Sequence, residues 1–185
     1  MAQYLVTGGI PLKGHVHISG NKNSALKLLA ASLLASGKTT LYNIPIIRDV
    51  EVMIEILTSL GAQVTGQGTA IICIDTSAVS GWKISPELAT RLRASIVLLG
   101  PLLARFGRVK LGFPGGDTIG KRGVGTHFQA LSDLGAKFTN SPLHIDGKIN
   151  GSVKPAQNIF LDEASVTATE NALMYAANLN QITII

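Results

Sequence analysis

Residues 49–65 read DVEVMIEILTSLGAQVT, and this stretch decides the fold class because it combines a helix, a stop signal and a strand. Its apolar residues at 50, 53, 54, 57 and 60 have the spacing of one helical face. Gly61 can end that helix. Residues 63–65 and 70–74 then follow as two short strands. The stretch therefore predicts alternating helices and strands.

The flanking segments continue this alternation. Upstream, the Ala- and Leu-rich residues 24–36 predict a buried helix that ends at Gly37, and residues 39–44 predict a strand. Downstream, Ser85 can cap one helix that runs from Pro86 towards Arg105, with a kink at Gly100 and Pro101. The further predicted elements are a helix stop at Gly107, a strand over 109–113, a helix over 126–134 and a stop at Gly135.

Parts of the pattern recur, which indicates an internal repeat. Leu60-Gly61-Ala62 is answered by Leu134-Gly135-Ala136, and Gly37 is answered by Gly107. We predict two copies of one β-α-β-α-β-β unit. A third copy begins with a helix over 168–178 and a strand over 181–185, and we expect it to be incomplete. The alternative is that the last strand closes the sheet of a complete small domain.

The composition excludes several classes of protein. The chain has 185 residues, a net charge of +5, 46% hydrophobic residues and 15% charged residues, which is too apolar for a disordered chain. Its basic residues do not cluster and aromatics make up only 5%, so no nucleic-acid partner is expected. No apolar stretch is long enough for a membrane span and no secretory signal is visible, so we expect a cytoplasmic protein. A single cysteine, Cys73, excludes a disulfide framework.

Two basic motifs are candidates for binding an anion. Lys22-Asn23-Ser24 precedes the first long helix, whose N-terminus attracts negative charge. The alternative is that Asn23 or Ser24 only caps the helix. Arg91 and Arg93 lie two positions apart, on different faces of the predicted helix, so one can reach a ligand while the other is solvated.

The loop of residues 112–125, GFPGGDTIGKRGVG, has the most distinctive local composition. Its glycines allow backbone N–H groups to approach a ligand, and Arg122 can grip phosphate or carboxylate. Asp117 is its only carboxylate, and it could act as a general acid if its pKa were raised. The alternative is a flexible connection. His127, just beyond the loop, could be a hydrogen-bond donor, a base or a surface residue. The other histidines lack partners at metal-ligand spacing, so no metal site is expected.

Four ordered blocks resemble the UDP-N-acetylglucosamine enolpyruvyl (1-carboxyvinyl) transferases. They are residues 9–23, residues 93–107, residues 114–122 and residues 165–171, and the resemblance covers the whole chain. It implies an α/β fold of repeated β-α-β-α-β-β units, the inside-out barrel of the enolpyruvyl transferases. It also implies a two-domain enzyme, in which residues 1–21 belong to the second, missing domain and residues 22–185 form most of the first.

The resemblance implies a reaction as well. The family transfers enolpyruvyl from phosphoenolpyruvate to UDP-N-acetylglucosamine by addition and elimination, without a cofactor, in the cytoplasm. The product leads to peptidoglycan, and hence serves cell wall biogenesis, cell shape and cell division. By the match, Lys22 and Arg122 hold the anionic groups of phosphoenolpyruvate, Asn23 contacts the sugar, and Asp117 protonates the methylene carbon. The residues expected along the nucleotide and phosphates are Arg93, His127, Ser165, Val166 and Thr167.

Two features depart from the family pattern, and two alternative functions are kept beside the one that the resemblance implies. The family usually has Pro-Val-acidic-x-His after the loop arginine, whereas this chain has Gly123-Val124-Gly125-Thr126-His127. The second domain, with its own catalytic groups, is also absent, so we expect an inactive fragment. The rivals are an enzyme like the 3-phosphoshikimate 1-carboxyvinyltransferases and a non-catalytic remnant that binds a ligand or a partner protein.

Overall fold

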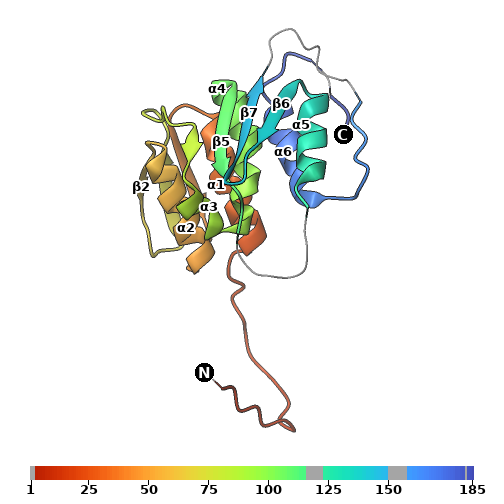
Figure 1. Cartoon of the computed structure of the whole chain (residues 1–185). Coiled ribbons are helices and arrows are strands. Elements are labelled where there is room, and N and C mark those ends of the chain that lie inside the picture. The colour runs from red at the N-terminus through yellow and green to blue at the C-terminus, as the bar shows by residue number, and fades with distance from the viewer. Residues whose placement is uncertain (1–2, 116–122, 150–157, 182) are drawn as a thin grey trace.

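The computed structural model describes residues 3–115, 123–149, 158–181 and 183–185. Helices lie between two sheets, and a long N-terminal segment extends away from them (Figure 1). The helices are α1 (Lys22–Ala31), α2 (Arg48–Ser59), α3 (Pro86–Thr90), α4 (Leu99–Phe106), α5 (Gly125–Asp133) and α6 (Val166–Ala176), with 3-10 turns η1 (Ser32–Leu34) and η2 (Arg93–Leu98). The strands are β1 (Lys38–Tyr42), β2 (Gln63–Thr65), β3 (Ile71–Asp75), β4 (Lys83–Ile84), β5 (Arg108–Gly112), β6 (Ala136–Asn140) and β7 (His144–Ile149).

The strands of the two sheets are connected in the same order along the chain. The first has the order β1-β3-β2 and the second the order β4-β5-β7-β6. In each sheet a strand leads into a helix, α2 or α5, and the next strand lies at the edge. The strand after that returns to the middle and pairs antiparallel with both of the others. β4 adds a parallel partner to β5 in the second sheet.

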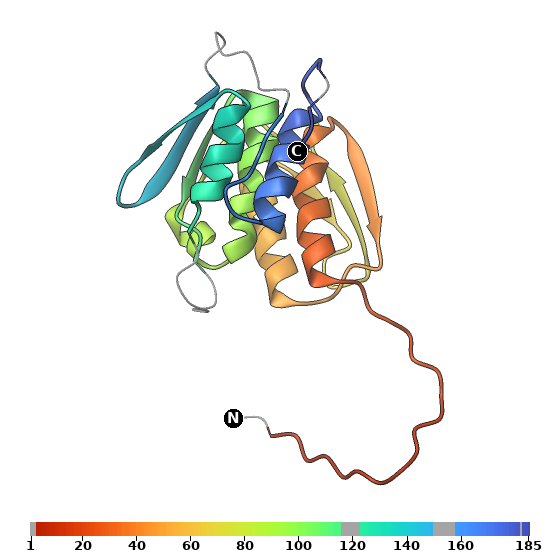
Figure 2. The same cartoon turned by 90° about the vertical axis from the view of Figure 1, so that its right-hand side faces the viewer.

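The helices form the buried centre of the molecule. Figure 2 shows α1, α4 and α6 between the two sheets, which lie on opposite sides of the helical layer. This position explains the Ala- and Leu-rich sequence of α1, because a helix covered on several sides cannot carry a broad polar face. The largest side chains that are almost fully buried are those of Leu29, Leu33, Met53, Ile56, Leu57, Leu60, Ile72, Ile74, Leu98, Leu99, Leu102 and Leu103.

The four glycines predicted to end helices all have a positive φ. The angle is 135° at Gly37, 105° at Gly61, 66° at Gly107 and 99° at Gly135. Residues with a Cβ atom rarely adopt a positive φ, whereas glycine does so without a steric penalty. The stops predicted at Gly61, Gly107 and Gly135 are therefore confirmed. The stop predicted at Gly37 is wrong, because α1 ends at Ala31, η1 ends at Leu34 and Ala35 is already extended.

The single helix predicted from Pro86 to Arg105 is wrong. Ser85 does cap its start, accepting a hydrogen bond from Leu88 N at 3.3 Å. The helix then ends after five residues, because Leu92 is extended, with φ −144° and ψ 114°. The chain continues as η2 and α4, and the expected kink at Gly100 and Pro101 is not where it breaks. Pro101 lies in the first turn of α4, where a missing N–H costs little.

Both ends of the chain also differ from expectation. Helix α1 is capped by Asn21, whose side chain accepts from Ser24 N at 3.0 Å, and not by Asn23 or Ser24. The strand expected over 181–185 is reduced, in the described part of the chain, to a parallel bridge between Asn158 and Ile184.

The N-terminal segment, residues 3–19, is exposed along its whole length. It extends away from the helices and sheets in both views (Figures 1 and 2). Its exposed large apolar residues are Tyr4, Leu5, Val6, Ile10, Leu12, Val16 and Ile18. None of the helices in the described residues is both long and apolar enough to cross a membrane.

Candidate functional site

A pocket of about 620 Å³ lies where four helices begin. The first turns of α1, α2, α5 and α6 each contribute residues to its wall. Its lining comprises Lys22, Asn23, Leu26, Lys27, Asp49, Arg91, Leu92, Arg93, Ala94, Ile96, Gly123, Thr126, His127, Glu163, Ala164, Ser165 and Thr167. Each helix N-terminus carries a partial positive charge and unpaired backbone N–H groups. Their convergence, together with four Lys and Arg side chains against two acids, Asp49 and Glu163, favours an anionic ligand.

Lys22 is the first residue of α1 and is paired with the first turn of α2. Its Nζ lies 2.9 Å from Oδ2 of Asp49, and 53% of the Lys22 side chain and 36% of the Asp49 side chain are exposed. A pair this exposed contributes little stability, on the order of 0–1 kcal/mol. A ligand anion can therefore replace Asp49 as the partner of Lys22.

Two other cations in the wall are bound more firmly by carboxylates. Lys27 lies 3.2 Å from Glu170, and less than a third of either side chain is exposed. Arg91 donates two hydrogen bonds to Glu55, at 2.6 and 3.0 Å. This bonding lowers the pKa of Glu55 below its usual value. Arg91 is therefore held towards α2 by a bidentate pair, which an anion in the pocket would have to break.

Arg93 comes from a different element than Arg91, which corrects the expectation that both lie on one helix. Arg91 follows α3, whereas Arg93 begins η2. Its guanidinium donates to the carbonyl of Gly123 at 3.4 Å. Arg91 and Arg93 both line the pocket, because the extended residue between them breaks the helix.

His127 is buried in the first turn of α5, with 5% of its surface exposed. Burial, and secondly the charge of Arg93, lower its pKa to about 4. Its Nε2 lies 3.1 Å from Oγ1 of Thr167, and its Nδ1 lies 2.8 Å from Nδ2 of Asn171. At neutral pH this residue is an uncharged hydrogen-bonding group and not a surface histidine.

The start of α6 places two hydroxyl residues beside His127. Ser165 caps the helix, since its Oγ accepts from Ala168 N at 3.3 Å. Both Ser165 and Thr167 line the pocket. Val166, between them, is 73% exposed, and its side chain is not part of the wall.

The structure thus brings together six predicted site residues from four separate parts of the chain. They are Lys22, Asn23, Arg93, His127, Ser165 and Thr167. Asp117 and Arg122 lie outside the described residues, so their positions remain predictions. Sequence reasoning missed the acids Asp49 and Glu163, the cation Lys27 and the buried amide of Asn171. Only Asn171 had a signal, because it ends the fourth resemblance block.

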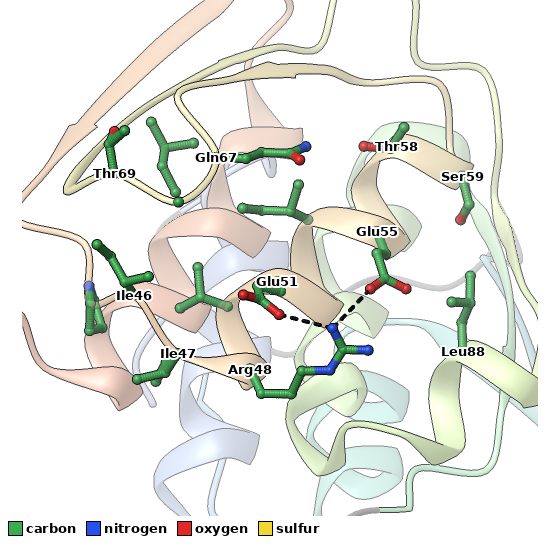
Figure 3. A pocket seen from close by; sticks show the side chains of 15 residues that line it. Ile46, Ile47, Arg48, Glu51, Glu55, Thr58, Ser59, Gln67, Thr69 and Leu88 are labelled. Atoms are coloured by element: carbon green, nitrogen blue, oxygen red, sulfur yellow. Dashed lines mark hydrogen bonds and ion pairs between the residues drawn. The ribbon is translucent and has the colours of Figure 1, made fainter.

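A second hollow, of about 800 Å³, lies between α2 and residues 67–69, which precede β3 (Figure 3). Its wall is partly apolar, with Ile46 and Ile47 at one end (Figure 3). Its charged groups pair with one another, since Arg48 lies 2.9 Å from Glu51 and 3.6 Å from Glu55 (Figure 3). None of the predicted site residues lines it. The pocket at the helix N-termini is therefore the candidate site.

The described part of the chain lacks a cluster of metal ligands. No group of three His, Cys, Asp or Glu residues there has the geometry to hold a metal ion. The chemistry that the described pocket offers is hydrogen bonding and positive charge.

Comparison with known proteins places this geometry in a family. The family model for EPSP synthase (3-phosphoshikimate 1-carboxyvinyltransferase) matches residues 6–185. The UDP-N-acetylglucosamine 1-carboxyvinyltransferase of Bradyrhizobium diazoefficiens is 45% identical over 181 residues, which cover 98% of this chain and 41% of that protein. The protein of the same name from Treponema denticola is 44% identical over 187 residues, covering 100% of this chain and 43% of its own. The chain therefore spans about two fifths of the length of these curated relatives.

Solved structures agree on the fold. The enolpyruvyl transferase NikO from Streptomyces tendae superposes with a TM-score of 0.73 at 24% identity, covering 92% of this chain and 40% of that one. An EPSP synthase from Acinetobacter baumannii gives 0.65 at 15% identity, covering 88% and 38%. The predicted α/β fold class of the enolpyruvyl transferases is confirmed.

Proposed function

The chain belongs to the EPSP synthase family, and from that membership we propose that it supplies one wall of the active site of an enolpyruvyl transferase. The substrates proposed are phosphoenolpyruvate and UDP-N-acetylglucosamine, the sugar nucleotide named in the relatives that are 40–46% identical. The observation that carries the proposal is the pocket in which Lys22, Asn23, Arg93, His127 and Thr167 converge. Both substrates are anionic, and the wall of this pocket is cationic.

The reaction is an addition followed by an elimination. The 3-hydroxyl of the sugar loses its proton to a base as its oxygen forms a bond to C2 of phosphoenolpyruvate. A proton is added to the methylene carbon, C3, so that the C2–C3 double bond becomes a single bond. This tetrahedral intermediate then loses a proton from C3 and its phosphate, which leaves the enolpyruvyl ether. We assign the proton donor to Asp117 and the grip on phosphoenolpyruvate to Arg122 and Lys22. The role of general acid requires that the pKa of Asp117 be raised in the closed site.

The rest of the wall is assigned to the sugar nucleotide. Asn23 contacts the sugar near its reacting hydroxyl, and Arg93 and His127 face the diphosphate together with the N-terminus of α6. A helix N-terminus that carries Ser165 and Thr167 offers backbone N–H groups and hydroxyls to such a group. Val166 can contribute through its backbone.

We further propose that the chain works only with a second domain, to which residues 1–21 contribute strands. An open pocket cannot exclude water or hold two reactants in line. The product of this reaction is a peptidoglycan precursor. The proposed role is therefore cytoplasmic and serves cell wall synthesis, cell shape and cell division.

The test is a titration and a turnover assay on the purified 185-residue chain. We expect UDP-N-acetylglucosamine to bind, and no phosphate to be released when phosphoenolpyruvate is added. Phosphate release at an enzymatic rate would contradict the need for a second domain. Failure of the sugar nucleotide to bind would contradict the assignment of the pocket.

A second candidate is favoured by the family model, which is named for 3-phosphoshikimate 1-carboxyvinyltransferase. Shikimate 3-phosphate is also an anion and would enter the same cationic pocket. Titration of the chain with both ligands separates these two candidates. If the chain binds a ligand but fails to react when it is joined to a complementary domain, it is a non-catalytic binding remnant.

A further inference from the structure

Asn171 lies fully buried in the middle of α6, and its amide orientation is fixed by the backbone. Its Oδ1 accepts from the N–H of Gly100 at 2.7 Å. Its Nδ2 donates to the carbonyl of Ile96 at 2.9 Å. A backbone N–H can only donate and a carbonyl can only accept, so the amide cannot be turned over. The positions of its oxygen and nitrogen follow from these two partners.

This orientation determines where His127 carries its proton. The second hydrogen of Asn171 Nδ2 is directed at His127 Nδ1, 2.8 Å away. Because an amide NH₂ group only donates, Nδ1 must be the unprotonated nitrogen. A neutral imidazole then has its hydrogen on Nε2, which donates to Oγ1 of Thr167 at 3.1 Å.

The charges around His127 keep the ring neutral. Arg93 on η2 repels a positive imidazole, and burial disfavours it further. Lys22 and Lys27 on α1 add positive charge to the same pocket. The acids that line this pocket are Asp49 on α2, which pairs with Lys22, and Glu163 just before α6. Glu170 on α6 pairs with Lys27 but is not part of the lining. A proton on Nδ1 would also oppose the N–H of Asn171.

The remaining group is the hydroxyl of Thr167. Its oxygen accepts from His127, and within the described residues it has no second hydrogen-bond partner. Its own hydrogen is therefore left for the pocket, which Thr167 lines beside His127 and Arg93. We propose that Asn171 is a positioning residue that fixes the Nε2–H tautomer of His127 and thereby makes Thr167 a hydrogen-bond donor to an anionic oxygen of the ligand. The identity of that ligand rests on the proposed function, whereas the tautomer does not.

The tautomer is tested on the free chain by long-range ¹H–¹⁵N NMR of histidine side chains. The sequence has four histidines, and His127→Gln identifies the signal of interest. We expect a neutral Nε2–H imidazole at pH 6. An Nδ1–H tautomer, or a ring already charged at that pH, would overturn the proposal.

Asn171→Asp tests the control of the tautomer by Asn171. A carboxylate in place of the amide accepts from Nδ1–H, so we expect the pKa of His127 to rise by at least about one unit. The control is Asn178→Asp, just beyond the end of α6, since Asn178 donates to the carbonyl of Ala104 at 3.0 Å and, among the described residues, is not a hydrogen-bond partner of His127. An equal His127 pKa in both variants would contradict the role of Asn171. If Asn171→Asp does not fold, the wild-type spectrum still decides the tautomer.

Thr167→Val tests the donor, with UDP-N-acetylglucosamine as the probe. We expect about tenfold weaker binding, because valine keeps the shape and loses the hydroxyl, and Thr167→Ser should restore most of the affinity. Thr169→Val is the control, since that hydroxyl donates to the carbonyl of Ser165 within α6. Unchanged affinity in Thr167→Val would overturn the donor role. No binding by the wild-type chain would instead overturn the proposed ligand, and the NMR result would still stand.

Discussion

Lys22 shows how a residue at a helix start can be both paired and available to a ligand. Its partner Asp49 competes for the same ammonium group at 2.9 Å, in a pair that is open to water. The two residues should therefore affect anion binding in opposite directions.

We predict that Lys22→Ala weakens binding of phosphoenolpyruvate about tenfold, whereas Asp49→Asn strengthens it. The first variant removes a charge from the pocket, and the second removes the competitor. Titration calorimetry at low salt measures both effects. Lys38→Ala, at the exposed start of β1, is the control for a change in net charge. Weaker binding in Asp49→Asn would show that Asp49 itself contacts the ligand.

The buried His127 predicts how stability depends on pH. Its pKa is about 4 in the folded chain and about 6.5 when unfolded, so between these values only the unfolded chain binds the proton. The contribution of the neutral, buried imidazole to the free energy of unfolding is complete above pH 6.5. It falls as the pH drops and is lost below about 4. It is on the order of 3 kcal/mol.

Chemical denaturation of the wild type and of His127→Gln between pH 4 and 8 measures this effect. We expect the stability advantage of the wild type to shrink as the pH falls through this window. Leu173→Ala, at an exposed position of α6, should keep the wild-type pH dependence. A wild-type advantage that is constant with pH would mean that folding does not lower the pKa of His127.

At the scale of elements, α4 and α6 approach closely at one glycine. A Cβ built on Gly100 would overlap the backbone carbonyl of Asn171 and lie 2.9 Å from its Oδ1. Both helices are buried there, so neither can move without disturbing the core.

We predict that Gly100→Ala destabilises the chain by about 1–3 kcal/mol, the usual cost of overpacking. Gly125→Ala is the matched control, because a Cβ at the start of α5 meets nothing within 4 Å. It should leave stability unchanged or raise it by up to about 1 kcal/mol. Urea midpoints of the two variants test the prediction, and similar values would contradict the close contact.

Local signals predicted the elements well where a single residue ends them. The confirmed glycine stops and the Ser85 cap depend on backbone conformation that the residue itself favours. The break at Leu92 depends on a distant contact. Gly115, after β5, donates to the carbonyl of Ala89, which Ser95 also uses at 3.2 Å. In a continuous helix that carbonyl would accept a hydrogen bond from the N–H of Arg93. No pattern in the neighbouring sequence predicts that this hydrogen bond is missing.

The candidate site was also predictable only where local motifs carry the information. Lys22, Arg93 and Thr167 belong to motifs that could be recognised one at a time, and the fold brings them to one pocket. The role of Asn171 emerges only from its contacts with Gly100, Ile96 and His127, which lie more than 40 positions away in sequence. Sequence spacing cannot reveal such a bridge.

At the scale of the whole molecule, the N-terminal segment contrasts with the packed helices and sheets. Every residue from 3 to 19 is exposed, including large apolar side chains such as Ile10, Leu12 and Val16. Apolar residues in such a segment gain nothing from burial and are available to another surface. This is the behaviour expected of strands that pair with the proposed second domain.

We therefore predict that removing residues 1–18 leaves the melting temperature of the remainder within about 2 °C of the full chain, because a segment without buried area adds no free energy of unfolding. Calorimetry measures the transition, and analytical ultracentrifugation should show less self-association in the shortened chain, since its exposed apolar side chains are gone. Removal of residues 1–24 is the control. It also deletes Asn21, whose side chain caps α1, together with the first three residues of that helix, and should cost about 1 kcal/mol or more. A fall of more than about 4 °C on removing residues 1–18 alone would mean that the segment packs against the helices and sheets in solution and is not held ready for a second domain.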